Sequence, residues 1–270
     1  MDEYLRELQI AKRLANDAGA IMRKYFSSGE DGARVKDDKT IVTKADTEIN
    51  LHVIAVLATE TPDYSVWGEE EKSIKQDAPY TWVCDPVDGT MPFAKGLPIS
   101  TFSIALVNAE GMSVLGVVYD PFTDKLYEAV RGKGAFMNGT PIRVSDKDTF
   151  DGAYIDEELW FNSEEQVAFD SPKGALNKQG AKVTTLCSAV ITGCMVANGT
   201  YDSMLFGQGK PEDIAALSVI VTEAGGKVTD LFGNEQRYDT NIRGAVVSNG
   251  HLHEKLVQLT SKMNYTSKYL

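Results

Sequence analysis

Apolar residues recur every three or four positions near the start of the chain. Over residues 2–27 this period gathers leucine, isoleucine and alanine side chains on one face, which predicts an amphipathic helix. A second helix is predicted from about residue 46 to residue 59. The pattern then changes to short extended segments, so two helices precede the first predicted strands.

The extended segments of the first half include a β-meander. Residues 66–67 and 81–84 are predicted to be short buried strands, each followed closely by acidic residues. Three longer strand-like segments come next, and the turns between them carry glycine, proline or aspartate. These segments are residues 100–108, 113–119 and 125–130.

The second half of the chain alternates between strands and helices. Strands are predicted at residues 152–155, 182–185, 201–206 and 244–248, and helices at residues 188–197, 213–224 and 251–262, with a weaker helical pattern over residues 163–179. This order favours two half-domains packed as one layered α/β body. We expect an N-terminal half over residues 1–145 and a C-terminal half over residues 146–270.

The composition narrows the classes of function. Among 270 residues, 39 are acidic and 27 basic, and the formal net charge of -12 argues against a general nucleic-acid binder, which needs a basic surface. The longest apolar runs fall short of 18 residues, so no membrane-spanning segment is expected. Three widely spaced cysteines without a CxxC motif, and a polar N-terminus, favour a reducing, cytoplasmic location.

Candidate chemistry is concentrated in the hexapeptide from Asp85 to Thr90. The predicted strand ends at Asp85, which places its carboxylate at a strand's carboxyl edge, where ligands of α/β proteins gather. Asp88 follows three residues later, and two carboxylates so close favour a divalent cation such as Mg²⁺. The amides of Gly89 and Thr90 are candidates for holding a phosphate. The alternative is an ordinary surface turn with a helix cap.

Three further acidic segments have the same two interpretations. Glu69 follows an apolar segment and a glycine, which again predicts a carboxylate at a strand end, whereas Glu70 and Glu71 are expected to be solvated. Asp46 and Asp213 would each also serve as an acid that stabilises a helix N-terminus. A purely structural role is plausible for each acidic segment by itself. It is a much weaker explanation for all four segments in this order.

The four segments in this order resemble the inositol monophosphatase family of Mg²⁺-dependent, lithium-sensitive phosphatases. The resemblance extends from about residue 4 to residue 250. It rests on Asp85-Pro86-Val87-Asp88-Gly89-Thr90 with Phe93, on Asp213-Ile214-Ala215-Ala216 through Gly225-Gly226, and on the segments Val42-Thr43-x-x-Asp46, Gly68-Glu69-Glu70 and Gly132 to Gly139. It implies an αβαβα sandwich of the sugar-phosphatase type, with an antiparallel sheet in the N-terminal half and a mixed sheet in the C-terminal half.

The resemblance also implies a role for each matched residue. Two to three Mg²⁺ ions would be held, the first by Glu69, Asp85 and the Val87 carbonyl and the second by Asp85, Asp88 and Asp213. A weaker third ion would use Glu69 and water. Asp46 and the Thr90 hydroxyl would orient and deprotonate the attacking water, and the Gly89 and Thr90 amides would bind phosphate. Paired cations neutralise a phosphate and stabilise its leaving oxygen, so hydrolysis needs no covalent nucleophile.

The substrate side departs from the family pattern. Inositol-specific members have an acid seven positions before the last metal aspartate, where this chain has Phe206. That residue would stack on a ring or belong to the core, and Ser188 and Ala189 match a stretch lining the substrate. Pro92 stands where the family has a polar residue, and Glu212 stands where it has tryptophan.

The expected function is hydrolysis of a small phosphorylated metabolite, as in an inositol monophosphatase. Histidinol phosphate, fructose bisphosphate and a 3′-phosphonucleotide remain alternative substrates. A non-catalytic regulatory protein on the same fold is the alternative of another class, although the matched acidic positions and Thr90 are all present. The resemblance further implies a homodimer.

Overall fold

The computed structural model describes residues 4–28, 32–35, 41–70, 72–159, 171–207 and 209–262. Its first half contains α1 (Leu5–Ser28), β1 (Arg34–Val35), β2 (Ile41–Val42), α2 (Lys44–Glu60), β3 (Ser65–Gly68), β4 (Lys72–Ser73), β5 (Tyr80–Asp88), α3 (Thr90–Ala94), β6 (Thr101–Asn108), β7 (Ser113–Asp120), β8 (Lys125–Val130), β9 (Ala135–Met137) and β10 (Thr140–Pro141). Its second half contains β11 (Tyr154–Glu158), α4 (Lys173–Lys178), β12 (Lys182–Thr184), α5 (Ala189–Ala197), β13 (Ser203–Phe206), the 3-10 turn η1 (Pro211–Asp213), α6 (Ala215–Glu223), β14 (Lys227–Thr229), β15 (Ala245–Ser248) and α7 (His253–Thr260).

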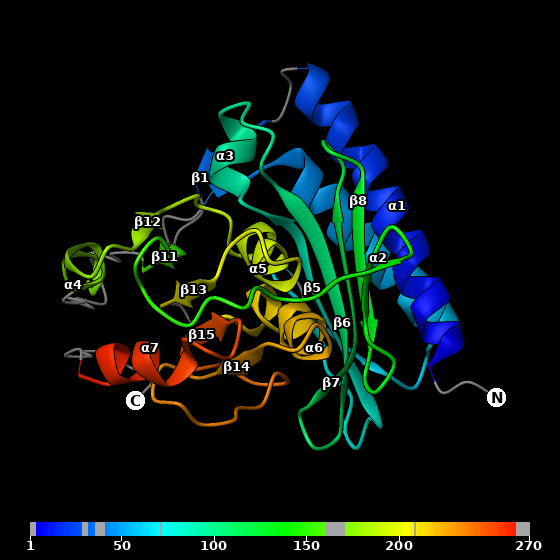
Figure 1. Cartoon of the computed structure of the whole chain (residues 1–270). Helices are drawn as coiled ribbons and strands as arrows, with labels where there is room; N and C mark the ends of the chain where they lie inside the picture. Colours follow the sequence, from blue (N-terminus) through cyan, green and yellow to red (C-terminus); the bar gives the residue numbers. More distant parts are fainter. Residues whose placement is uncertain are drawn as a thin grey trace.

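These elements form alternating helical and sheet layers (Figure 1). Helices α1 and α2 cover one face of an eight-stranded sheet, and α5 and α6 lie between that sheet and a five-stranded one. Helices α4 and α7 lie on the far side of the smaller sheet. The expected αβαβα order of layers is therefore present.

The larger sheet has the strand order β10-β9-β8-β7-β6-β5-β3-β4. Its neighbouring strands run antiparallel except for β3 and β5, which run parallel. The central strand β6 is buried almost throughout because both of its faces are covered. Ile104 and Leu106 pack in the core beneath α1 and α2, while Ala105 and Val107 pack in the core around α5 and α6.

Helix α6 approaches the larger sheet closely at one glycine. A Cβ atom on Gly116 of β7 would lie 2.6 Å from the carbonyl oxygen of Ala216 and 2.8 Å from a Val219 methyl group. The absence of a side chain at this position therefore lets the helix backbone rest directly on the strand. The same helix contains the segment that follows Asp213, so this contact fixes one side of the acidic region.

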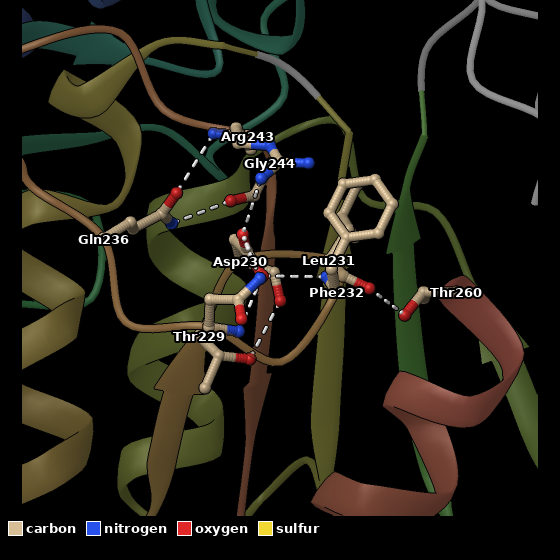
Figure 2. A network of polar contacts seen from close by, with 9 residues as sticks. Thr229, Asp230, Leu231, Phe232, Gln236, Arg243, Gly244 and Thr260 are labelled. Carbon is tan, nitrogen blue, oxygen red and sulfur yellow. Dashed lines mark hydrogen bonds and ion pairs between the residues drawn. The ribbon is translucent and has the colours of Figure 1, made fainter. Parts of the chain in front are cut away.

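The smaller sheet has the order β12-β11-β13-β15-β14 and is mixed. Strand β11 runs parallel to both of its neighbours, and β15 runs antiparallel to both of its own. Figure 2 shows how the connection between β14 and β15 is held: the buried carboxylate of Asp230 accepts the Phe232 amide at 2.8 Å. Gln236 closes the same connection by donating to the Gly244 carbonyl at 2.8 Å.

The sequence predictions differ from the structure at identifiable places. Strand β5 continues through Asp88 instead of ending at Asp85, and the helix predicted over residues 213–224 is divided into η1 and α6. The strand predicted at residues 152–155 is shifted to Tyr154–Glu158, and β14 was not predicted. Residues 163–170 of the weak helical pattern lie outside the described residues. Among the described residues, no helix combines the length and the apolar character needed to cross a membrane.

Candidate active site

The candidate site begins where β3 ends beside Cys84 of β5. The two strands are parallel, and Gly68 is the register partner of Cys84. An acidic residue follows each of these two residues: Glu69 follows Gly68, and Asp85 follows Cys84. Parallel strands place their carboxyl ends at the same edge of a sheet, which explains why residues 16 positions apart meet here.

An irregularity in β5 brings Asp85 and Asp88 together. In a regular strand, residues three positions apart point to opposite faces. Here the pairing with β6 shifts between Asp85 and Asp88, which are opposite Ser103 and Thr101 respectively. Pro86 lies inside the shift, where its missing N–H costs no ladder hydrogen bond. Both carboxylates can therefore approach the same point.

The third acid of this group comes from η1. The carbonyl of Glu212 accepts the Ser103 hydroxyl at 3.2 Å, which anchors η1 against β6. Asp213 follows, and oxygen atoms of Asp85, Asp88 and Asp213 all lie within 4.8 Å of one another. The structure thus brings together the three residues predicted to share one metal ion.

A second group consists of Asp46, Glu69 and Glu70, again with oxygen atoms within 4.8 Å of one another. Thr43 and Asp46 form a capping box at the start of α2, and the Thr43 amide donates to Asp46 at 2.8 Å. The structural and functional interpretations of Asp46 are therefore compatible. Glu70, expected to be solvated, is half-buried and belongs to this group. We call the six carboxylates of the two groups the acidic site.

Burial makes ionisation of the acidic site costly. It raises the pKa of Asp85 well above its usual range, with a further rise from Glu69, and it also raises that of Asp213. Burial raises the pKa of Asp88 to about 6 despite hydrogen bonds that lower it, and raises that of Asp46 to about 7. A nearby cation would stabilise the charged form of carboxylates that lie this close together, in addition to the hydrogen bonds that they accept.

The donor set fits a hard divalent cation. All six side chains of the acidic site offer carboxylate oxygens, the ligand type that Mg²⁺ and Ca²⁺ prefer, while softer metals favour sulfur or imidazole ligands. The Val87 carbonyl, the other predicted ligand, accepts the Thr90 hydroxyl at 2.9 Å and has a second lone pair available. A bound cation would supply the positive charge that the clustered carboxylates require.

Gly89 and Thr90 lie beside the acidic site at the start of α3. Gly89 has φ of 75°, and a Cβ atom there would lie 3.0 Å from the Ser188 side chain, so both backbone conformation and space require glycine. The Thr90 hydroxyl lies 3.3 Å from a carboxylate oxygen of Asp46. The two groups predicted to orient and deprotonate the attacking water are therefore within hydrogen-bond distance of each other.

The three residues predicted to contact substrate are all buried. The Ser188 hydroxyl donates to Asp88, and the Val190 amide donates to the same carboxylate oxygen at 3.1 Å. Ala189 lies between them at the start of α5 and is 5% exposed. Phe206 is 2% exposed and packs in the core around α5 and α6, so it does not line an open surface. The structure therefore supports the core-packing interpretation of Phe206.

The structure places both residues that depart from the family pattern, Glu212 and Pro92, in buried positions. Glu212 accepts the indole N–H of Trp67 at 3.2 Å, and its side chain is outside the two carboxylate groups. The Lys72 ammonium lies over the Trp67 ring, 3.2 Å from its centre. Pro92 is buried within α3.

Lys210 is a residue of the site that the sequence analysis missed. Its Nζ atom lies 2.8 Å from Oε1 of Glu69. The only available signal was its place three residues before Asp213, at the position that precedes η1. Sequence spacing alone gave no reason to connect it with an acid 141 residues away.

The chain is similar to known proteins over almost its whole length. The sequence model for the inositol monophosphatase family matches residues 4–265. The chain belongs to the inositol monophosphatase family. It is 30% identical to a protein of Aquifex aeolicus named fructose-1,6-bisphosphatase/inositol-1-monophosphatase, covering 97% of this chain and 98% of that protein. It is 34% identical to inositol monophosphatase 2 of Solanum lycopersicum, covering 95% and 97%.

Solved structures of the family share the fold. An IMPase from Thermotoga maritima superposes with a TM-score of 0.83 at 28% identity, covering 96% of this chain and 98% of that one. The layered α/β architecture and the family membership predicted from the sequence are thus confirmed. The inositol monophosphatase family consists of metal-dependent phosphatases, so this member is a phosphatase of phosphate monoesters.

Proposed function

We propose that the chain is a Mg²⁺-dependent phosphomonoesterase that hydrolyses a small phosphorylated polyol or sugar. One observation carries the proposal: β3, β5, α2 and η1 bring six acidic side chains into two groups of three carboxylates, and the Thr90 hydroxyl contacts Asp46 of one group. Glu69, Asp85, Asp88, Asp213 and the Val87 carbonyl would hold two to three ions. When bound, the ions supply positive charge that stabilises the phosphate and its leaving oxygen and acidifies water.

Thr90 and Asp46 are proposed to move the proton of the attacking water. The Thr90 hydroxyl can donate to Asp46, at 3.3 Å, or to the Val87 carbonyl, at 2.9 Å, so its proton has two alternative acceptors. Burial raises the pKa of Asp46 to about 7, which suits a proton acceptor working near neutral pH. The two hydrogen bonds from Thr43 hold this carboxylate in place.

Gly89 and Thr90 are proposed to bind the phosphate oxygens through their backbone amides. Ser188 and Ala189 would border the substrate through the backbone of the α5 start, while the Ser188 hydroxyl positions Asp88. Phe206 occupies the sequence position where inositol-specific members have an acid, and its ring is buried in the core, so this position offers no carboxylate to bind a sugar hydroxyl. The proposed substrate preference is therefore broader than inositol phosphate. Fructose 1,6-bisphosphate is a second candidate because the Aquifex relative is named for both activities.

Phosphate release from a defined panel tests this proposal. The panel contains inositol 1-phosphate, histidinol phosphate, fructose 1,6-bisphosphate and adenosine 3′,5′-bisphosphate, each assayed with Mg²⁺ and again with EDTA. We expect release from at least one of the first three compounds with Mg²⁺, and its loss with EDTA. Hydrolysis that survives EDTA would refute the metal-dependent mechanism. If none of the compounds releases phosphate, the result would favour the non-catalytic regulatory alternative.

Three finer properties are also proposed. Lithium inhibition and a homodimer rest on the family resemblance, and a cytoplasmic location rests on the three free cysteines, Cys84, Cys187 and Cys194. Lithium titration of the phosphatase assay tests the first property. Light scattering at micromolar protein concentration tests the second, and fractionation of cells that express the chain tests the third.

A further inference from the structure

A lysine side chain reaches into the acidic site. Lys210 is held in an extended backbone conformation immediately before η1. Its ammonium forms an ion pair with Glu69, Nζ to Oε1 2.8 Å, in which the Glu69 side chain is only 12% exposed. Glu69 is also one of the residues proposed to hold a metal ion. A cation of the chain itself is therefore in contact with an oxygen that a metal would need.

The surroundings hold this lysine in its charged form. Burial by itself lowers the pKa of Lys210, but the carboxylates of Glu69 and Asp213 raise it by more, and the net pKa lies above its ordinary value. Conversely, Lys210 lowers the pKa of both Asp85 and Asp213 against the effect of their burial. The ammonium thus offsets part of the repulsion among Glu69, Asp85 and Asp213.

The lysine also has a route away from the site. Its side chain is 34% exposed, nearly three times the exposed fraction of Glu69. A four-carbon stem with several rotatable bonds lets the ammonium swing into solvent without displacement of η1. A divalent cation on Glu69 would repel the ammonium from the same carboxylate, so the two cations compete for one oxygen atom.

We propose that Lys210 is a tethered counter-ion that occupies Glu69 in the metal-free protein and must leave when Glu69 binds a metal ion. It is a positioning residue that sets metal affinity, stabilising the empty acidic site and weakening metal binding by the free energy of its own ion pair. The inference rests on the proposed function only in taking Glu69 as a metal ligand. It assigns to Lys210 a role that is independent of the identity of the substrate.

Metal binding by the intact chain without substrate tests the proposal. Titration calorimetry with Mn²⁺, and separately with Mg²⁺, compares the wild type with Lys210→Gln, Lys210→Arg and Lys227→Gln. Lys227 is the matched control because its ammonium also pairs with a glutamate, Glu254 at 2.7 Å, on the exposed face of β14 and α7. Both glutamine variants remove one positive charge and one ion pair, but only one of them alters the acidic site.

We expect Lys210→Gln to bind metal about tenfold more tightly than the wild type, the change that corresponds to one charged hydrogen bond. Lys210→Arg keeps the charge and should remain near wild-type affinity, as should Lys227→Gln. In EDTA, Lys210→Gln should unfold at a lower temperature than the wild type, and saturating Mg²⁺ should remove that difference. If Lys210→Gln fails to unfold cooperatively, Lys210→Met replaces it, since methionine keeps most of the apolar stem.

Two results would overturn the inference, and they can be told apart. Unchanged or weaker metal binding by Lys210→Gln, alongside measurable binding by the wild type, would overturn the counter-ion role alone. Absence of metal binding by the wild type and every variant would overturn the proposed function together with this inference.

Discussion

Replacing Asp88 by Asn should stabilise the metal-free protein while abolishing hydrolysis. Burial raises the pKa of Asp88 from its ordinary value of 3.8 to about 6 in the folded protein. The rise of about two pH units, at 1.36 kcal/mol each, means that ionised Asp88 destabilises the metal-free fold by about 3 kcal/mol. An uncharged amide removes that cost.

The stabilisation expected from Asp88→Asn depends on pH. Because the folded pKa lies above the unfolded one, the folded state binds more protons between pH 3.8 and pH 6, and wild-type stability falls as pH rises through that window. Above pH 6 the cost is fully present, and below pH 3.8 it is absent. The advantage of Asp88→Asn should therefore be largest near pH 7.5 and should shrink as the pH is lowered toward 4.

The fold should tolerate this substitution. Asp88 accepts hydrogen bonds from the Ser188 hydroxyl and from the Val190 amide at 3.1 Å, and a carboxamide oxygen can accept both. The amide cannot replace the negative charge that would bind a metal ion. Phosphate release should consequently fall to background, and Mn²⁺ binding should weaken.

Denaturant unfolding in EDTA measures the stability change, at pH 7.5 and at pH 4.5. Asp202→Asn is the matched control because Asp202 is also buried and also accepts a serine hydroxyl, that of Ser145, and a backbone amide, that of Tyr154 at 2.8 Å. Asp202 belongs to neither carboxylate group, so its replacement should neither stabilise the protein nor reduce hydrolysis.

Two outcomes would refute the reasoning about Asp88. If Asp88→Asn is no more stable than the wild type in EDTA at pH 7.5, the cost assigned to the buried charge is wrong. If the variant keeps near-normal phosphate release, Asp88 is not a metal ligand that hydrolysis requires.

Three other predictions concern separate contacts. Gly116→Ala should lower the free energy of unfolding by about 1–3 kcal/mol, because its Cβ atom would lie 2.6 Å from a carbonyl oxygen of α6. An unchanged denaturation midpoint would count against this close packing. Ser188→Ala should reduce kcat or metal affinity about 10- to 100-fold by releasing Asp88; an increase in KM alone would instead indicate a substrate contact. Asp230→Ala leaves two backbone amides of the β14–β15 connection, those of Phe232 and Asn234, without their acceptor, and each should cost about 1–3 kcal/mol of stability. Asp230→Asn keeps a carbonyl acceptor and should lower the free energy of unfolding by less in the same assay.

Most of the longer helices and strands, and the carboxylate-rich chemistry, could be predicted from the sequence alone. The sequence shows helical periodicity over residues 2–27 and apolar segments that are followed by acids. Both are local patterns, which can be recognised without knowledge of the fold. The four acidic segments in their order, with the motif from Asp85 to Thr90 among them, carried enough specific residues to indicate the inositol monophosphatase family, which the comparisons confirm. The roles of the individual site residues stay predictions.

The contacts between distant side chains depend on the three-dimensional packing of the chain. The shifted pairing of β5 with β6 brings Asp85 and Asp88 to one point, and sequence spacing alone predicts opposite faces for a regular strand. Lys210 reaches Glu69 across 141 residues, and Glu70 joins Asp46 instead of remaining solvated. Phe206 lies in the core because the layer between the two sheets covers it, a consequence of packing that an aromatic residue at a strand end does not reveal. Long-range contacts depend on register and on the packing of layers, and neither is encoded in any short stretch of the chain.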